Sequence, residues 1–179
     1  MKKKPYVSVV IVGRNDGYGD DFVGRINTFV RSLDHQVANH PGVFELIIVE
    51  WNPAGDYAPL ADVIDHTHNL PVRVITVSKD LHDTIGSAHP VLEFHGKNVG
   101  IRRARGDFVL VTNPDILFTQ QLIDEIAGKK LRLDTVYRTD RYDFTTAGIK
   151  DVVSEDLVDF AVANTFVVHA MADRTSVSE

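Results

Sequence analysis

The sequence predicts an α/β domain with a mostly parallel central sheet, on the basis of two features. Short apolar runs rich in β-branched residues, such as 7–12, in which only Ser8 is polar, are typical of strands that are buried on both faces. These runs alternate with helical patterns, the clearest of which places the apolar residues from Phe22 to Leu33 on one helical face. Because strands that alternate with helices usually pair in parallel, we expect a single domain over residues 1–179.

Local signals predict where the individual elements begin and end. Asp20 and Asp21 precede the first helix, where carboxylates suit the positive end of the helix dipole. Thr119 is expected to cap the N-terminus of a later helix, and Gly106 to end a helix at 98–105 in a left-handed conformation. Strands are expected at 7–12, 44–49, 72–77, 108–112 and 135–138, further helices at 60–64 and 154–163, and an irregular segment at 78–96.

Composition and charge exclude several classes of function. The chain has no cysteine, which removes a disulfide framework, a thiol nucleophile and a cysteine-ligated zinc or iron–sulfur site. Its net charge of −6 disfavours binding to nucleic acid, which needs a basic face. No apolar run approaches the ~18 residues of a membrane span, and the polar residues 13–16 come too early for a signal peptide. We therefore expect a cytoplasmic protein with no membrane span.

The ligand site is expected at the carboxyl ends of the parallel strands, where open α/β sheets bind their ligands. The residues that directly follow the predicted strands are therefore the candidates for ligand contact. Trp51, among them, can stack on a ligand ring or pack inside the protein, and both roles stay open. The candidates are Gly13, Arg14 and Asn15 after the first strand, Glu50 and Asn52 after the second, and Asn113 and Asp115 after the fourth.

One kind of ligand that these strand ends suggest is a dinucleotide. Gly17 and Gly19 lie between a strand and a helix, and Glu50 ends the second strand, where an acid would bind a ribose. However, the third glycine of the Gly-x-Gly-x-x-Gly fingerprint should fall at position 22, which is Phe22. A nicotinamide-dependent oxidoreductase is therefore the less favoured enzyme class, and a P-loop is absent because no Gly-Lys-Ser/Thr occurs.

The other kind of ligand is a nucleotide-sugar, which the segment 97–115 favours. Asn98, Gly100, Ala104 and Gly106 follow the pattern Asn-x-Gly-x-x-x-Ala-x-Gly, and an apolar strand then leads to Asn113-Pro114-Asp115. This segment resembles the core of family 2 glycosyltransferases with the GT-A fold, which end that strand in Asp-x-Asp. The first two predicted strands also resemble those of that fold, so the resemblance covers about residues 5–140.

The resemblance implies a GT-A Rossmann-like sandwich that transfers a sugar from a nucleotide-diphosphate sugar. Asp115 matches the carboxylate that holds a divalent cation, Mn²⁺ or Mg²⁺, which neutralises charge on the leaving diphosphate. Asn113 replaces the first aspartate of the motif by a neutral oxygen ligand, so the affinity for metal should be lower. Glu50 is expected to bind the base or ribose, and Asn98 and Arg102 to position the diphosphate or donor sugar.

The resemblance also implies a division of the chain into a donor-binding half at 5–115 and a shortened acceptor-side half at 116–179. Asp140 and Asp143 are the candidate general bases in the second half, although ion pairs with Arg138 and Arg141 are an alternative role. The acceptor, a glycan, a lipid or a protein, is not specified by the sequence. Because the acceptor side is short, a non-catalytic nucleotide-sugar-binding module, a homo-oligomer or a separate acceptor subunit are alternatives.

The histidines show no carboxylate pattern of a zinc hydrolase and are expected at the surface or in loops. The candidate histidines for such a site are at positions 66, 68, 82, 89 and 95.

Overall fold

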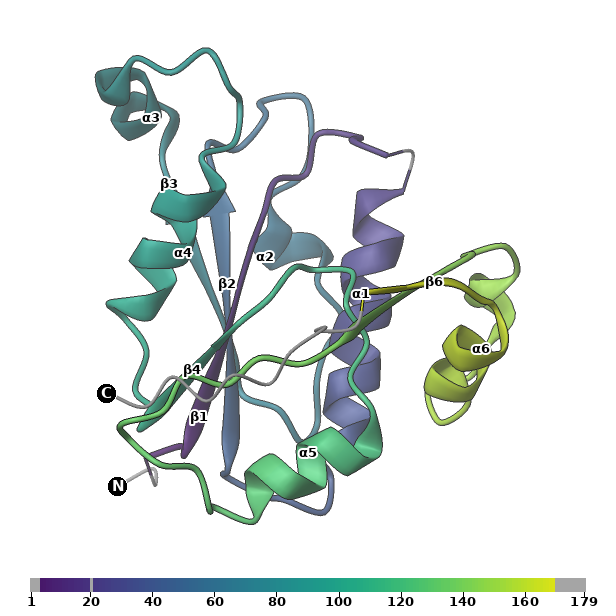
Figure 1. Ribbon diagram of the computed structural model, residues 1–179. Coiled ribbons are helices and arrows are strands. Elements are labelled where there is room, and N and C mark those ends of the chain that lie inside the picture. The colour runs from purple at the N-terminus through teal and green to yellow at the C-terminus, as the bar shows by residue number, and fades with distance from the viewer. Residues whose placement is uncertain (1–3, 20, 170–179) are drawn as a thin grey trace. The chain divides into compact units, whose positions relative to one another are not determined.

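The computed structural model describes residues 4–19 and 21–169, which form two compact units (Figure 1). The first unit spans Met1–Lys130 and the second spans Leu131–Glu179. The division of the chain at residue 115 into a donor-binding half and an acceptor-side half stays a prediction. None of the helices in the described ranges is long and apolar enough to cross a membrane.

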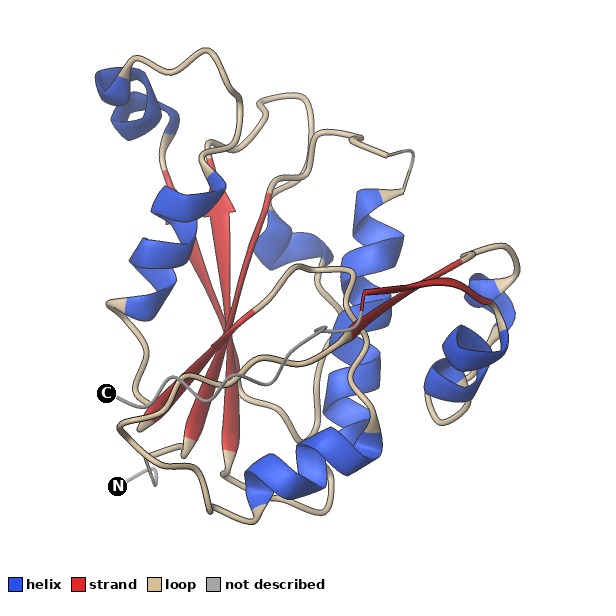
Figure 2. Ribbon diagram, viewed as in Figure 1, coloured by secondary structure: helices blue, strands red, loops and turns tan. Residues whose placement is uncertain are grey.

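The first unit is built on a parallel sheet of four strands, drawn in red in Figure 2. Its strand order is β3-β2-β1-β4, and every neighbouring pair runs parallel. All residues of β1 and β2 are buried, because both strands are central and covered on both faces. The strands are β1 (Val7–Gly13), β2 (Phe44–Trp51), β3 (Val72–Val77) and β4 (Phe108–Val111). The predicted α/β class is thus confirmed, and the strand order is consistent with a GT-A-like, Rossmann-type fold.

Helices cover both faces of this sheet, with α1 and α4 on opposite sides (Figure 1). The predicted start of α1 is confirmed at Asp21, whose side chain accepts a hydrogen bond from Gly24 N at 3.0 Å, whereas Asp20 lies outside the described residues. Thr119 caps α5 as predicted, accepting from Leu122 N at 3.2 Å. The helices are α1 (Phe22–Gln36), α2 (Leu60–Val63), α3 (Lys79–Ile85), α4 (Glu93–Ile101) and α5 (Gln120–Ala127).

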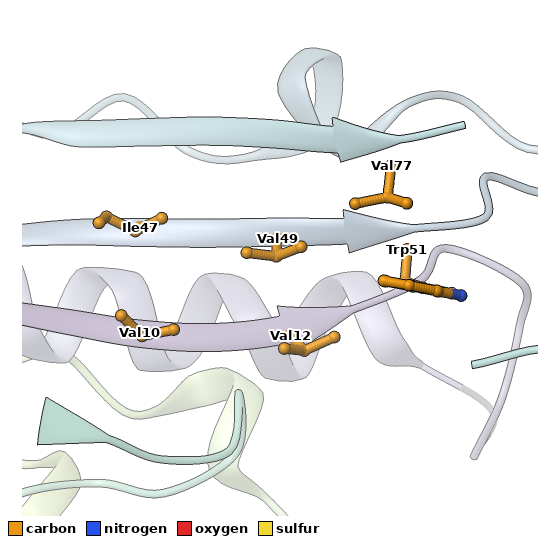
Figure 3. Packing of buried hydrophobic residues seen from close by; sticks show 6 residues of the cluster. All are labelled: Val10, Val12, Ile47, Val49, Trp51 and Val77. Carbon is orange, nitrogen blue, oxygen red and sulfur yellow. The ribbon is translucent and has the colours of Figure 1, made fainter. Parts of the chain in front are cut away.

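Apolar side chains from β1, β2 and β3 form a core cluster (Figure 3). The contacts of α4 with Val10 and Val12 place this helix over the cluster. Two glycines let this helix approach the sheet closely: a Cβ added at Gly96 would lie 2.7 Å from Val12 Cγ1, and one at Gly100 would lie 2.4 Å from Val10 Cγ1. Side chains at these positions would push α4 outward. The cluster consists of Val10, Val12, Ile47, Val49, Trp51 and Val77.

Three local predictions are wrong. Residues 78–96 are not irregular, because α3 and the first part of α4 lie there; Ser78 caps α3 and left-handed Gly86 ends it. The helix predicted at 98–105 ends at Ile101, and Gly106 is not its cap. Instead, a Cβ at Gly106 would lie 2.6 Å from Ser8 N, so this glycine allows close backbone contact with β1. No strand is assigned at 135–138, and the next strand begins at Arg141.

The second unit contains a two-stranded antiparallel ribbon of β5 (Arg141–Phe144) and β6 (Thr165–His169). Between them lie a short 3₁₀ helix, η1 (Ile149–Asp151), and α6 (Leu157–Ala163), which confirms the later part of the helix predicted at 154–163. Leu157 and Ala161 form the buried face of α6. The strand β6 was not predicted from the sequence.

Candidate functional site

The candidate site lies where the strand order of the parallel sheet reverses. β1 pairs with β2 on one side and with β4 on the other. The connection after β1 therefore leads to its neighbour on one side, and the connection after β3 leads to β4 on the other side of β1. Thr112 N donates to Val10 O at 3.1 Å, which continues the β1–β4 pairing to the carboxyl edge. The predicted residues after β1 and after β4 are therefore brought to one edge of the sheet, at the position where such sheets bind ligands.

Gly13 makes room for an aromatic ring. A Cβ at this position would lie 2.4 Å from Cζ of Phe22, the first residue of α1. Phe22 is itself buried, so its ring occupies the space over the end of β1. In a dinucleotide site that space must admit the pyrophosphate, and the helix N-terminus must be open to it. Here the carboxylate of Asp21 already caps that N-terminus.

Arg14, Asn15 and Asn52 join three loops at the carboxyl edge. Arg14 Nε donates to Asn52 O at 2.6 Å, and Asn15 Nδ2 donates to Ala58 O at 2.9 Å. Asn52, in a left-handed conformation with φ 50°, donates through Nδ2 to Pro90 O at 3.0 Å. These bonds link the loops that follow β1, β2 and α3. The structure thus gives these residues a positioning role, while direct ligand contact by them stays a prediction.

Glu50 lies inside β2, and its carboxylate is only 1% exposed. Its Oε1 accepts from Leu60 N at 2.8 Å, and its Oε2 accepts from Thr76 Oγ1 at 3.1 Å. A buried carboxylate needs such donors, because an unpaired buried charge is costly. Glu50 therefore holds the start of α2 against the sheet, and the prediction that it contacts a base or ribose is untested.

The end of β4 brings a lysine and an amide together. Lys97, on α4, donates from Nζ to Asn113 Oδ1 at 3.0 Å and also contacts the carboxylate of Glu93. Asp115, two residues further on, is exposed. The side chain of Lys97 is only 17% exposed, so its ammonium is held at this position. Lys97 was not singled out as a site residue from the sequence; the adjacent Gly96, whose added Cβ would lie 2.7 Å from Val12 Cγ1, is a local signal that could have indicated its close approach.

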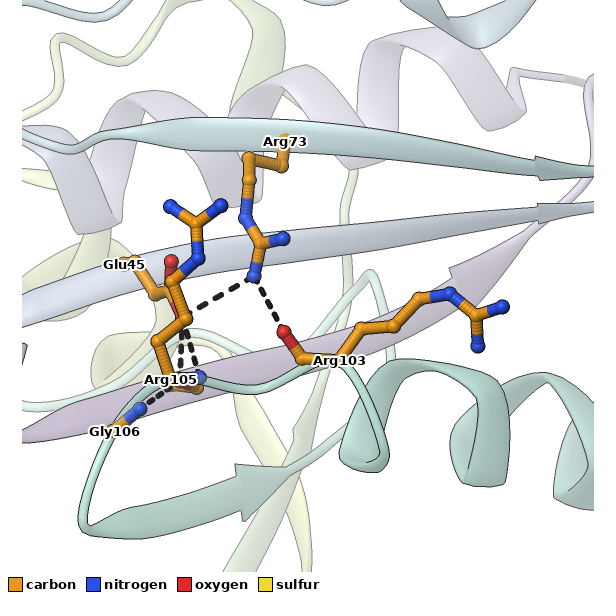
Figure 4. Close-up of polar contacts among 6 residues, drawn as sticks. Glu45, Arg73, Arg103, Arg105 and Gly106 are labelled. Carbon is orange, nitrogen blue, oxygen red and sulfur yellow. Dashed lines mark hydrogen bonds and ion pairs between the residues drawn. The ribbon is translucent and has the colours of Figure 1, made fainter.

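Arg102 lies at the opposite end of α4, beyond the last helical residue Ile101, and is not brought together with the residues after β1 and β4. The segment that follows α4 is bound to the amino ends of the strands (Figure 4). Glu45, the second residue of β2, accepts from Arg105 N at 3.0 Å and from Arg73 Nη2 at 3.4 Å. Arg73 Nη2 also donates to Arg103 O at 2.7 Å.

Asn98 is exposed on α4, and its backbone carbonyl accepts a hydrogen bond from Arg102 N at 3.0 Å. Ligand contact by Asn98 or Arg102 therefore stays a prediction.

Trp51 is packed and not available for stacking, since it is only 2% exposed. Its Nε1 donates to Nδ1 of His82 at 2.9 Å, and the ring of His95 lies 6.1 Å from its own ring. His82 is a buried residue of α3, which differs from the expected surface or loop position. Because its Nδ1 accepts this bond, the neutral ring carries its proton on Nε2. This pair ties α3 to the end of β2.

A divalent cation would find one free carboxylate, Asp115, at the end of β4. The oxygen of Asn113 already accepts from an ammonium, and the described residues contain no group of three His, Cys, Asp or Glu side chains that could hold a metal. Such a donor set fits a weakly held ion whose shell is completed by ligand phosphates, not a preformed metal site.

The candidate general bases, Asp140 and Asp143, belong to the second unit. Asp143 accepts from His169 Nε2 at 2.9 Å and pairs with Arg141 at 3.0 Å. The hydrogen bond from His169, with the charge of Arg141, lowers the pKa of Asp143 from its usual value. A lowered pKa makes a carboxylate a weaker proton acceptor. Asp140 is exposed, and a catalytic role for either aspartate stays a prediction.

Comparisons with known proteins give limited similarity. No protein-family model matches the chain, and no curated protein matches it. Two crystal structures of S. aureus TarS, one of them of residues 1–349, match with TM-scores of 0.42 at 18% and 19% sequence identity. TarS is a glycosyltransferase.

The matches cover 68% of this chain but only 31% and 19% of the TarS chains, so the chain spans less than a third of their length. A TM-score of 0.42 is too low to establish a shared fold, and the fold class rests on the strand order and register.

Proposed function

We propose that the protein binds a nucleotide-diphosphate sugar at the carboxyl edge of its parallel sheet and acts as a glycosyltransferase. One observation carries this proposal: the segment 97–115, which resembles the family 2 glycosyltransferase core, ends at the switch in strand order with Lys97, Asn113 and Asp115 at the edge. A cation and a carboxylate at this edge suit a diphosphate, with or without a metal ion.

In this proposal the chain's own residues position the donor. The loops that Arg14, Asn15 and Asn52 hold together form a rigid support for the nucleoside, and rigid support lowers the entropy lost on binding. The residues after β4 face the diphosphate, where negative charge grows as the bond between sugar and phosphate breaks. A divalent cation bound by Asp115 and the phosphates would add charge neutralisation. Asp140 or Asp143 would activate the acceptor, which remains unspecified.

The dinucleotide alternative has two local features against it. The Phe22 ring covers Gly13, and the Asp21 carboxylate occupies the N-terminus of α1, where a pyrophosphate would need free N–H groups. A phosphate placed there would meet a negative charge.

A second candidate function is a non-catalytic nucleotide-sugar-binding module. The observation that favours it is the pairing of Asp143 with both His169 and Arg141, which lowers the pKa of the candidate base. A homo-oligomer or a separate acceptor subunit would then supply the acceptor side. A cytoplasmic location also stays a prediction.

Thermal shift with a ligand panel tests the proposal. The panel contains UDP-, GDP- and dTDP-sugars and NADH, each with Mn²⁺ and with EDTA. A ligand present at 100 times its Kd should stabilise the folded protein by about 2.7 kcal/mol. We expect stabilisation by at least one nucleotide-sugar and none by NADH. Stabilisation by NADH alone would reverse this ranking. Hydrolysis or transfer of the sugar, measured on the ligand that binds, separates the enzyme from the binding module.

A further inference from the structure

The position of Lys97 depends on the close packing of α4. Gly96 and Gly100 lie four residues apart, on the helix face that contacts the sheet, and any side chain there would meet Val12 or Val10. Because α4 is close to the sheet, the stem of Lys97 reaches the end of β4 and its Nζ lies 3.0 Å from Asn113 Oδ1. The side chain is mostly covered, at 17% exposed, so its charge has a defined position.

The partners of Lys97 leave its charge available to a ligand. A lysine ammonium has three N–H donors, and within residues 4–19 and 21–169 its partners Asn113 and Glu93 account for two of them. Asn113 is neutral, so it orients the ammonium without cancelling its charge. Glu93 is 48% exposed and lies four residues away on the same helix, so its carboxylate can turn to solvent when another anion binds Lys97. A phosphate can therefore replace Glu93.

We infer that Lys97 is the phosphate-binding cation of this site and that Asn113 is the residue that positions it. The inference rests on the proposed function and deepens it. The site then presents a lysine side chain at the end of β4, so a diphosphate binds there without a metal ion. It also explains why an asparagine at position 113 suits this chain: an aspartate would add a second carboxylate, beside that of Glu93, that competes with the phosphate for Lys97.

Titration calorimetry with UDP, GDP, dTDP and inorganic pyrophosphate in EDTA tests the inference. Loss of a charge-assisted hydrogen bond to phosphate should weaken binding about tenfold or more in Lys97→Met. Lys97→Arg should retain part of the affinity because it keeps the charge. Lys4→Met is the matched control, since Lys4 forms an ion pair with Asp107 at the amino end of the sheet and should bind as the parent does. Circular dichroism verifies that each variant is folded.

Asn113→Asp provides the reverse test. It should weaken binding of the same probes in EDTA and make binding depend more strongly on Mn²⁺, because it pairs with Lys97 and adds a carboxylate ligand. If Lys97 had a purely structural role, Asn113→Asp would not both weaken binding in EDTA and increase the dependence of binding on Mn²⁺.

The outcomes separate the two proposals. If the parent binds a nucleoside diphosphate in EDTA and Lys97→Met binds it equally well, the Lys97 inference is wrong while the proposed function stands. If the parent binds pyrophosphate through Lys97 but binds none of the nucleotides, the anion site stands and the proposed function fails. A parent that binds neither kind of probe in EDTA overturns the Lys97 inference, and binding restored by Mn²⁺ would then keep the proposed function alone.

Discussion

Replacing Gly100 by alanine tests the close packing of α4 on which the candidate site depends. The added Cβ would lie 2.4 Å from Val10 Cγ1 and 3.3 Å from Val49 Cγ2, and atoms at the first distance overlap. Val10 is fully buried in β1, and its branched side chain has little freedom to rotate away. The helix must therefore move outward or the strand must distort.

Two opposing effects set the size of the change in stability. Alanine in place of glycine gains at most about 1 kcal/mol of helix propensity, and less near a helix end. Overpacking of a buried contact costs about 1–3 kcal/mol. Because the neighbour is stiff and buried, we expect overpacking to dominate, with a net loss of about 1–2 kcal/mol in the free energy of unfolding. For a chain of this size that loss lowers Tm by roughly 2–8 °C.

Urea denaturation followed by circular dichroism measures this loss in Gly100→Ala against the parent. Gly55→Ala is the control, because nothing lies within 4 Å of its added Cβ and its backbone needs no left-handed conformation. The control should remain within about 0.5 kcal/mol of the parent. A Gly100→Ala protein as stable as the parent, or more stable, would show that α4 does not pack against the sheet at this distance. The position argued for Lys97 would then lose its basis.

Three further predictions concern the residues around the site. Trp51→Phe should lower the free energy of unfolding by at least about 1–3 kcal/mol in urea denaturation, because it leaves Nδ1 of His82 buried without a donor; an unchanged value would contradict the bond. In calorimetry, Mn²⁺ should strengthen binding of a nucleoside diphosphate beyond its value in EDTA, and Asp115→Asn should remove that gain; a gain that persists would place the metal elsewhere. The hydrogen bond from His40 lowers the pKa of Asp124, so the stabilisation should be complete above about pH 4 and lost as the pH falls through the lowered pKa. Urea denaturation between pH 3 and 7 should show the parent and Asp124→Asn converging in stability at the acid end, and a constant difference would refute the linkage.

The sequence by itself determined the α/β class and the places of the four parallel strands. The first two strands are buried along their whole length and are rich in β-branched and apolar residues, a pattern that is visible in a single segment of sequence. The cap residues Asp21 and Thr119 were predictable for the same reason, since a capping bond spans only three residues of the chain. The residues at the carboxyl edge could also be named, because a residue that follows a parallel strand must lie at that edge.

Only the tertiary structure decided what those residues contact. Glu50 accepts from the start of α2, Arg14 donates to the backbone after β2, and Lys97 reaches Asn113 across the edge of the sheet. These partners are 10 to 38 positions apart in the sequence, and no local pattern encodes such a pairing. The helix after Val77 was missed although its caps are local, since Ser78 accepts from Leu81 N and Gly86 ends the helix in a left-handed conformation. The bond from Trp51 to His82, which joins α3 to the end of β2, could be seen only in the tertiary structure.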